Sequence, residues 1–361
     1  MGYGNYPDLT EIKKILVIKL RHLGDVLLTA PFFSILKKSL PQAEIDAYIY
    51  AESLPMLEGH PDIHELIGYD RKWKKLSFFQ RMKREFVLLR RIKKEKYDLV
   101  INLTEGDRGA VCARISKARI KVGIDPGKKS KRKIYTHIVK IPGAPRHIVE
   151  KNLDALRRIG IFPKESDKKL QIFLPEKARE KMRALLLEKG CLPKEYILIH
   201  PATRWKFKGW REDRVVELIQ MLVERGEKVV LTSGPDSEEV ALIERIVKAA
   251  GSDSCLSLAG KVDLKELGAL IDLSCVCVCM DTAALHIASS LKAKNVVLFG
   301  PTSEKNWGPW QNPNAIVVTK NFSCRPCYMD GCGGSKKSSC LEEIEAKEVL
   351  EAIYTLKSSP K

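Results

Sequence analysis

Residues Val276 to Pro301, VCVCMDTAALHIASSLKAKNVVLFGP, have the pattern of a strand, a tight turn, a helix and a second strand. The first of these residues, Val276–Met280, form a short apolar run with β-branched side chains, which is typical of a buried parallel strand. Ala283–Leu291 has the composition of a short helix, and Asn295–Phe299 is a second apolar run that ends at a Gly-Pro pair. A strand, a helix and a strand in this order predict a parallel βαβ unit.

The turn between that strand and that helix carries Asp281 and Thr282, two residue types that cap helix N-termini well. A helix that starts at the carboxyl end of a parallel strand points its free N–H groups and positive dipole end into the crevice above the sheet. Such a helix start is suited to binding phosphate. It is equally the form of an ordinary capped βα turn, so the local pattern by itself leaves both interpretations open.

The rest of the chain repeats this alternation of strands and helices. Strands are predicted at 14–19, 43–50, 63–67, 98–103, 121–124, 136–141, 196–200, 228–233, 255–259, 276–280 and 295–299. Helices are predicted at 25–40, 77–96, 107–117, 147–159, 211–225, 236–250, 264–273, 283–291 and 342–356. Strands alternating with helices of this length predict parallel sheets with right-handed crossovers and helices on both faces.

A charged segment, 164–190, separates the alternation into two halves, and 361 residues are too many for one compact core. We therefore predict an α/β protein of two Rossmann-like parallel-sheet domains, residues 1–165 and 166–345, facing a central cleft. Residues 346–361, the end of the last helix, are expected to pack back on the junction. Ligands of open α/β sheets bind outside the carboxyl ends of the strands, so the functional residues should follow those ends.

Composition narrows the class of protein. The hydrophobic content of 44% is that of a globular chain. No apolar run approaches the ~18 residues that cross a bilayer, and the polar residues 1–14 lack a signal-peptide core, so a cytoplasmic protein is expected. Lys and Arg number 63 against 45 Asp and Glu, a net charge of +18. Such an excess favours a polyanionic partner, whether nucleic acid, anionic lipid or a phosphorylated substrate.

The first strand runs into RHLGDVLLTAP, residues 21–31. Gly24 allows the backbone to turn tightly or to approach a ligand closely. Asp25 falls at the start of the following helix, beside the carboxyl end of the strand. The local pattern favours an N-cap for Asp25, and the functional alternative is a general base held above the sheet.

Two turns in the second half have the same placement. The loop HPATRWKFKGW follows a strand and offers a hydroxyl and cations that suit a diphosphate, although a solvated basic loop has the same composition. These residues are Thr203, Arg204, Lys206 and Lys208. The turn LTSGPDSEE puts Glu238 in a first helical turn, where a carboxylate can accept both ribose hydroxyls or simply favour the helix dipole.

Four blocks, GDVLLTAP, HPATRWKFKGW, SGPDSEE and MDTAALHIASSL…VVLFGPT, together resemble the ADP-heptose:lipopolysaccharide heptosyltransferases, the family 9 glycosyltransferases. The blocks occur in the family's order, and the resemblance covers most of the chain. It implies a GT-B fold, with the acceptor in the N-terminal domain and the nucleotide sugar in the C-terminal one. The subtype resembles the third- or second-heptose enzymes more than the first.

The resemblance also implies roles for matching positions. Asp25 corresponds to the acidic residue that deprotonates the acceptor hydroxyl, Glu238 to the ribose-binding carboxylate, and Val262 to the backbone contact with adenine. Thr203 and Lys208 correspond to positions around the donor diphosphate. The donor cradle, whose amides hold phosphate and whose Asp faces the sugar, corresponds to Asp281, Thr282, Ala283, Ala284 and His286. The family usually has Gly at the position of Ala283. The alanine side chain in this sequence leaves less room for a phosphate to approach the backbone closely.

The resemblance implies an inverting transferase that moves a heptose from ADP-L-glycero-D-manno-heptose to the phosphorylated inner core of lipopolysaccharide, with no cofactor and no required metal. Such an enzyme would work in the cytoplasm, on the anionic inner face of the bacterial inner membrane. Nucleic acid is not expected as a partner, because the basic residues are not interleaved with aromatics on a recognisable module. The alternatives are a transferase for another nucleotide sugar and a non-catalytic protein that binds lipopolysaccharide or nucleic acid.

Two further features carry expectations. A basic loop is predicted to grip the acceptor together with Gly24, and with the basic stretch 72–96 to hold the anionic membrane. The loop consists of Lys128, Lys129, Lys131, Arg132 and Lys133. The tail CRPCYMDGCGGSKKSSC carries four cysteines that can form a structural zinc site or remain free thiols. They are Cys324, Cys327, Cys332 and Cys340.

Overall fold

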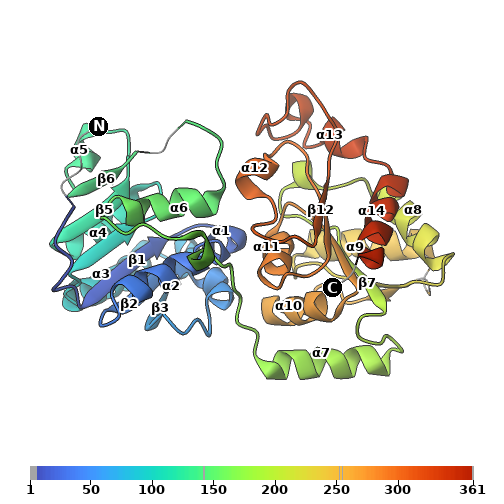
Figure 1. The fold of residues 1–361 in the computed structure, drawn as a ribbon, viewed down its shortest axis with the longest axis horizontal. Coiled ribbons are helices and arrows are strands. Elements are labelled where there is room, and N and C mark those ends of the chain that lie inside the picture. Colours follow the sequence, from blue (N-terminus) through green and yellow to red (C-terminus); the bar gives the residue numbers. More distant parts are fainter. Residues whose placement is uncertain (1–5, 141–142, 252, 254, 360–361) are drawn as a thin grey trace. The chain divides into compact units, whose positions relative to one another are not determined.

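A computed structural model describes residues 6–140, 143–251, 253 and 255–359 of the chain. The chain divides into two units, Met1–Phe173 and Leu174–Lys361, each built around its own parallel sheet (Figure 1). The division falls slightly after the predicted boundary at residue 165. The predicted α/β class with two Rossmann-like parallel sheets is confirmed.

Within the described residues, the first unit has a six-stranded sheet in the order β3-β2-β1-β4-β5-β6. Its strands are β1 (Lys14–Lys19), β2 (Glu44–Tyr50), β3 (Glu65–Tyr69), β4 (Leu99–Asn102), β5 (Ile120–Ile124) and β6 (His137–Val139). Its α-helices are α1 (Leu23–Leu27), α2 (Ala30–Ser39), α3 (Phe78–Lys94), α4 (Asp107–Ile115), α5 (Lys129–Arg132) and α6 (Ile148–Arg157). Short 3₁₀ turns complete it: η1 (Ala51–Met56), η2 (Arg71–Lys75) and η3 (Glu165–Asp167). The predicted strand 136–141 ends earlier, and Ile141 lies outside the described residues.

The second unit repeats this winding in the order β12-β11-β10-β7-β8-β9. Its strands are β7 (Tyr196–His200), β8 (Lys228–Leu231), β9 (Leu256–Ser257), β10 (Val276–Met280), β11 (Asn295–Leu298) and β12 (Ala315–Val318). Its α-helices are α7 (Glu176–Glu188), α8 (Glu212–Val223), α9 (Ser237–Ala250), α10 (Leu264–Leu273), α11 (Ala283–Ser290), α12 (Glu304–Trp307), α13 (Ser339–Glu342) and α14 (Ala346–Ser358). The short turns are η4 (Lys206–Lys208) and η5 (Cys332–Gly334).

Both sheets reverse their winding direction next to their first strand. In the first unit the reversal lies between β1 and β4, and in the second it lies between β7 and β10. Loops leave in opposite directions at such a point, so a crevice opens above the carboxyl ends of the two strands. The fold therefore provides each unit with one preferred ligand position.

The predicted helix 25–40 is wrong, because the chain forms two helices there, α1 and α2. Pro31 lies at the start of α2, where its ring and missing N–H are tolerated, but neither would be tolerated inside one continuous helix. The predicted N-cap role of Asp25 is also wrong: the N-cap position belongs to His22, and Asp25 lies in the first turn of α1.

The core of the second unit includes its last helix. Val349, Ile353 and Leu356 on α14 are buried together with Val215 and Leu218 on α8. Figure 1 shows α14, in red, beside α8. The last helix is thus a structural element of the second unit, where it covers β10, β11 and β12. No helix of the described chain combines the length and the apolar character that a bilayer span needs.

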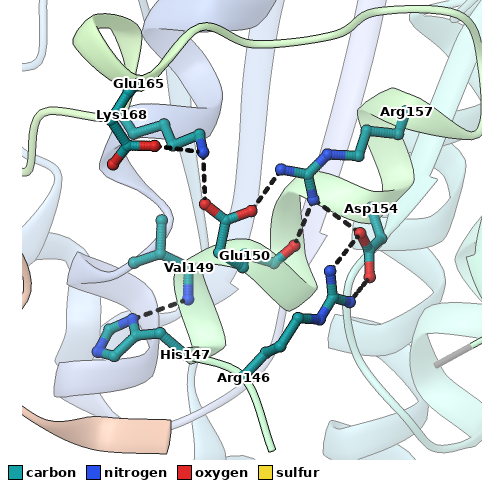
Figure 2. A network of polar contacts seen from close by, with 8 residues as sticks. All are labelled: Arg146, His147, Val149, Glu150, Asp154, Arg157, Glu165 and Lys168. Atoms are coloured by element: carbon teal, nitrogen blue, oxygen red, sulfur yellow. Dashed lines mark hydrogen bonds and ion pairs between the residues drawn. The ribbon is translucent and has the colours of Figure 1, made fainter. Parts of the chain in front are cut away.

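An ion-pair network holds α6 in place (Figure 2). Lys168 reaches the carboxylate of Glu150 at 2.6 Å, and Arg157 pairs with both Glu150 and Asp154. Arg146 pairs with Asp154 from the segment before the helix. Burial raises the pKa of Glu150, but the hydrogen bonds from Lys168 and Arg157 outweigh burial and leave the pKa below its ordinary value. The network thereby fixes α6 against the chain segments that precede and follow it.

Candidate functional site

Asp25 lies at the reversal point of the first sheet. It occupies the first turn of α1, directly beyond the carboxyl end of β1, and is partly buried. Within the described part of the chain, no hydrogen bond or ion pair engages its carboxylate. A carboxylate in this place is free to accept a proton from a ligand above the sheet.

A buried lysine, which sequence reasoning missed, lies next to this point. Lys19 is only 3% exposed, and its ammonium donates to Asn152 Oδ1 at 2.9 Å and to the Leu103 carbonyl at 3.3 Å. Burial lowers the pKa of Lys19 to about 8, although the negative charge of Asp25 acts in the opposite direction. Asn152 belongs to α6, so the network of Figure 2 also positions this lysine. The sequence signal was a lysine that directly follows the apolar run 15–18 of the first strand.

The basic loop lies on the same edge of the first sheet. Lys131 pairs with Asp107, which begins α4 just after the carboxyl end of β4. Arg132 forms a bidentate pair with Asp125, at 2.7 and 2.6 Å. These two cations are therefore already neutralised by carboxylates of their own unit. Lys128, Lys129 and Lys133 are exposed and are the loop cations best placed to meet an anionic ligand.

In the second unit, Asp281 gathers side chains from three loops at the reversal point. It directly follows β10 and is 7% exposed. Its Oδ2 accepts a hydrogen bond from Lys208 Nζ at 2.7 Å and another from Thr302 Oγ1 at 2.7 Å. Lys208 comes from the loop after β7, and Thr302 from the loop after β11. Two of the predicted donor residues, Lys208 and Asp281, thus lie together, and Thr302 is a member of the cluster that sequence reasoning missed.

The start of α11 borders this cluster. Thr282 holds the N-cap position with extended backbone, but its side chain makes no capping hydrogen bond. The Thr282 hydroxyl is buried and unpartnered within the described residues. Ala283 is the first helical residue, and Ala284 and His286 are buried behind it. The amide groups of the first turn are therefore not capped by Thr282, as suits a helix start that receives an anion.

Two other predicted donor residues meet through their loops. Glu238 lies in the first turn of α9 and pairs with Lys206 of η4 at 2.8 Å, with both side chains largely exposed. Thr203 donates its hydroxyl hydrogen to the Trp205 carbonyl at 2.7 Å, which shapes its own loop. Val262 is partly buried and immediately precedes the capped start of α10. The carboxyl-end loops of β7 and β8 are thus held together by an ion pair.

The histidine at the end of β7 adds no charge to the site. His200 is 8% exposed and makes a 3.0 Å hydrogen bond between its Nδ1 and Thr232 Oγ1. Burial lowers the pKa of His200 to about 4, so the ring is neutral at physiological pH. Positive charge beside Asp281 therefore comes from Lys208 and from the α11 dipole.

The cysteine tail does not assemble as a metal centre. Within the described residues, no three His, Cys, Asp or Glu side chains gather in a group that could hold a metal ion. Cys324 and Cys332 are exposed, Cys327 is partly buried and Cys340 is buried, all as free thiols. Hydrogen bonds from the side chain and the backbone N–H of Ser339 lower the pKa of Cys332. The structure thus gives the zinc prediction no support.

We expect Cys332 to react first with iodoacetamide, because it is exposed and the bonds from Ser339 favour its thiolate. Cys340 should react later, since burial raises the pKa of its thiol, and buried Cys277 should react only on unfolding. Timed alkylation followed by peptide mass spectrometry measures this order. Stoichiometric zinc, together with alkylation of Cys332 that accelerates only after chelator is added, would restore the metal-site interpretation.

Comparison with known proteins places this geometry in a family. The family described as glycosyltransferase family 9 (heptosyltransferase) matches residues 86–337. Lipopolysaccharide heptosyltransferase 3 of Escherichia coli (strain K12) is 35% identical over 340 residues, which cover 93% of this chain and 96% of the relative.

Solved structures agree in fold. The glycosyl transferase family 9 from Veillonella parvula DSM 2008 matches with a TM-score of 0.82 and 23% identity, covering 98% of this chain and 99% of that one. E. coli heptosyltransferase WaaC with ADP-2-deoxy-2-fluoro heptose matches with a TM-score of 0.71 and 20% identity, covering 95% and 99%. The family match spans well over half of the chain and contains the whole Asp281 cluster, so this protein is a glycosyltransferase that belongs to family 9, the heptosyltransferases.

Proposed function

We propose that this chain transfers a heptose from ADP-L-glycero-D-manno-heptose to the phosphorylated inner core of lipopolysaccharide, with inversion at the anomeric carbon. The observation that carries the proposal is the cluster of Asp281, Lys208 and Thr302 beside the uncapped start of α11. Two relatives support the substrates: the 35% identical E. coli protein is a lipopolysaccharide heptosyltransferase, and WaaC was solved with an ADP-heptose analogue.

The second unit provides what a diphosphate leaving group needs. The α11 amides and the Lys208 ammonium supply fixed positive charge next to the reversal point of the sheet, and Asp281 holds that ammonium in place. Fixed donors aimed at the charge that develops in the transition state usually contribute more to catalysis than any other single effect. In this role they favour departure of ADP without requiring a metal ion. Thr203, Ala283, Ala284 and His286 complete the proposed cradle.

The first unit provides the base. The acceptor hydroxyl oxygen attacks the anomeric carbon, and its proton passes to the Asp25 carboxylate. The bond from that carbon to the β-phosphate oxygen breaks, and its electron pair leaves with ADP. Attack from the face opposite the leaving group inverts the configuration. Gly24 lets the backbone approach the acceptor closely, and Lys128, Lys129 and Lys133 are available for the acceptor phosphates.

The proposed acceptor is anchored in a lipid bilayer, so we place the enzyme on the cytoplasmic face of the bacterial inner membrane. Exposed cations near an anionic bilayer surface contribute roughly 1 kcal/mol each. The net charge of +18 fits such a surface. The same positive charge would also attract the phosphate groups of the acceptor, which lie at the membrane surface.

Thermal stabilisation by a nucleotide-sugar panel tests the donor assignment. A ligand at 100 times its Kd stabilises by ~2.7 kcal/mol, which is read as a rise of a few degrees in Tm. We expect ADP-heptose and ADP to stabilise the chain while UDP-sugars do not, and expect the response to fall in Lys208→Ala. A response to UDP-sugars alone would reject the proposed donor.

Replacing Glu238 by Ala should weaken ADP binding and leave stability nearly unchanged, because this side chain is largely exposed and its one ion pair, with Lys206, lies at the surface. Its neighbour provides the contrast. Glu239 is partly buried and accepts the Gly234 N–H at 2.9 Å, so Glu239→Ala should lower Tm as well. Calorimetric titration with ADP measures the affinity of each variant. Unchanged ADP affinity in Glu238→Ala would remove this residue from the donor site.

A further inference from the structure

The longest helix of the first unit, α3, presents large apolar side chains to solvent. Phe78 is 71% exposed, Phe79 84%, Met82 50%, Phe86 62% and Val87 60%. Among the described residues, five of the fourteen exposed large apolar side chains fall within these ten consecutive positions. Isolated exposed apolar side chains are ordinary, whereas a contiguous group of them marks an interaction surface.

The spacing of these residues makes a stripe along one side of the helix. Phe78, Met82 and Phe86 recur every four residues, so they lie one above the other, and Phe79 packs edge-on against Phe78 with ring centroids 5.7 Å apart. A different side of α3 faces the core, where Leu88 is 7% and Ile92 0% exposed. We call Phe78, Phe79, Met82 and Phe86 the apolar stripe. Packing within the first unit therefore leaves this stripe uncovered.

Strong positive charge surrounds the stripe. Residues 71–96 contain twelve Lys and Arg but only two acidic residues, Glu85 and Glu95. Both carboxylates are bound by cations from outside the segment: Glu85 by Arg108 and Glu95 by Lys14, at 2.9 Å. Ten of the basic side chains make no ion pair within the part of the chain that the structure describes. They are Lys72, Lys74, Lys75, Arg81, Lys83, Arg84, Arg90, Lys93, Lys94 and Lys96.

Contacts along α3 fix where the stripe lies relative to the sheet. Glu85 accepts hydrogen bonds from Arg108 at 2.8 Å and from the Tyr69 hydroxyl at 3.0 Å. Tyr69 ends β3 and Arg108 lies in the first turn of α4, so Glu85 is level with the carboxyl edge of the sheet. The seven residues before Glu85 extend roughly 10 Å further, at 1.5 Å per residue. The stripe thus begins beyond the edge where Asp25 and the basic loop lie.

We infer that the first turns of α3 are the membrane-docking element of this enzyme, inserting the apolar stripe at the boundary of headgroups and acyl chains while the flanking Lys and Arg contact anionic headgroups. Helices with an apolar face and a basic polar face bind membranes in this manner. The inference rests on the proposed function in one respect, since a lipid-anchored acceptor explains why the edge that carries Asp25 turns toward a bilayer.

The positive charge around the apolar stripe indicates that the stripe binds a lipid bilayer and not a second copy of the chain. A symmetric contact through the stripe would bring the cations that flank it on each copy close to those on the other, and juxtaposed like charges cost several kcal/mol in such an interface. An anionic lipid bilayer instead provides an apolar acyl-chain region for the stripe and negatively charged headgroups for the cations. Anionic headgroups are therefore the chemistry that complements both features of the helix.

The test compares two double variants of the full chain on vesicles of phosphatidylethanolamine and phosphatidylglycerol. Phe79→Gln/Phe86→Gln removes half of the stripe and keeps the charge. Phe162→Gln/Leu187→Gln is the matched control, because both side chains are exposed apolar residues outside the stripe. Circular dichroism and Tm check that each variant is folded, and co-sedimentation measures vesicle binding at low and high salt.

We expect wild-type binding to keep a salt-resistant part, because insertion is not screened as surface charge is. The stripe variant should lose that part, with partitioning at high salt at least tenfold weaker, and the control should bind like wild type. Binding that salt abolishes completely, or equal binding by both variants, would overturn the inference. It would also be overturned by a stripe variant that binds vesicles normally but loses a dimer seen by sedimentation.

A second assay separates this inference from the proposed function. Transfer from ADP-heptose to an inner-core acceptor in detergent micelles should be equal in wild type and stripe variant, while transfer to the same acceptor in vesicles should fall with binding. Failure of transfer in both settings, with vesicle insertion intact, would reject the proposed function alone. Normal transfer in vesicles by a non-inserting variant would reject the inference alone.

Discussion

Asp25→Asn is expected to lower kcat by a factor on the order of 10² or more while leaving ADP affinity and Tm nearly unchanged. An amide keeps the shape of the side chain but cannot accept the acceptor proton at neutral pH. The loss of stability should be small, because Asp25 caps no helix end and its carboxylate makes no hydrogen bond or ion pair within the described residues. Steady-state kinetics with saturating donor, together with a Tm for each protein, measures both quantities.

A control isolates the general effect of losing an acidic residue from a first helical turn. Glu176 lies in the first turn of α7 with an exposed side chain, so Glu176→Gln makes the same chemical change away from the strand ends. We expect this control to keep wild-type kcat. If Asp25→Asn also keeps wild-type turnover in a folded protein, Asp25 is only a favourable helix residue and the base lies elsewhere.

Lys208→Ala is expected to lower kcat/KM for the donor roughly ten- to 150-fold, the equivalent of ~1.5–3 kcal/mol for a hydrogen bond to a charged group. The variant removes the ammonium proposed to meet the diphosphate. It also leaves the Asp281 carboxylate, 7% exposed, with Thr302 as its remaining hydrogen-bond donor from the cluster. An uncompensated negative charge would then repel the diphosphate. Donor titrations of initial rate measure the loss.

The matched control is another partly buried lysine–carboxylate pair of the same unit. Lys357 on α14 pairs with Glu227 just before β8, at the amino end of the strand, so Lys357→Ala removes a comparable ion pair far from the strand carboxyl ends. It should lower Tm without changing donor kinetics. Unchanged kcat/KM in Lys208→Ala would show that the donor diphosphate binds away from α11.

The sequence predicts the bounds of a strand or helix well where an apolar run is flanked by residues that end regular secondary structure. The bounds of β1, β10 and α10 agree with prediction, because each is a buried run whose ends carry charged or capping residues. β12 was not predicted, since it has only four residues, all partly exposed at the edge of its sheet. The amphipathic pattern of residues 25–40 predicted one continuous helix. Pro31 was the signal for a break between α1 and α2, because proline is not tolerated inside a helix.

The candidate site was predictable in its types of residue but not in its pairings. Asp25, Lys208 and Asp281 could be predicted because each follows a parallel strand. The carboxyl ends of parallel strands lie along one edge of a sheet, where ligands bind. The cluster itself depends on contacts across 73 residues for Lys208 with Asp281, and the buried lysine on a contact across 133 residues, from Lys19 to Asn152. A single sequence contains no local signal that two residues so far apart along the chain are in contact. The four tail cysteines form no metal-binding group among the described residues, and the choice between a zinc site and free thiols stays a prediction for the alkylation experiment.

Release of ADP on mixing the enzyme with ADP-heptose and a purified inner-core acceptor tests the proposed transfer reaction and both of its substrates. Each transfer frees one ADP and adds one heptose to the acceptor, so coupled detection of ADP and the mass of the acceptor must agree. We predict acceptor-dependent ADP release with an equal amount of heptosylated product, and loss of both in Asp25→Asn. ADP release that does not depend on the acceptor, or product formed only from a UDP-sugar, would show that the enzyme does not catalyse the proposed heptose transfer.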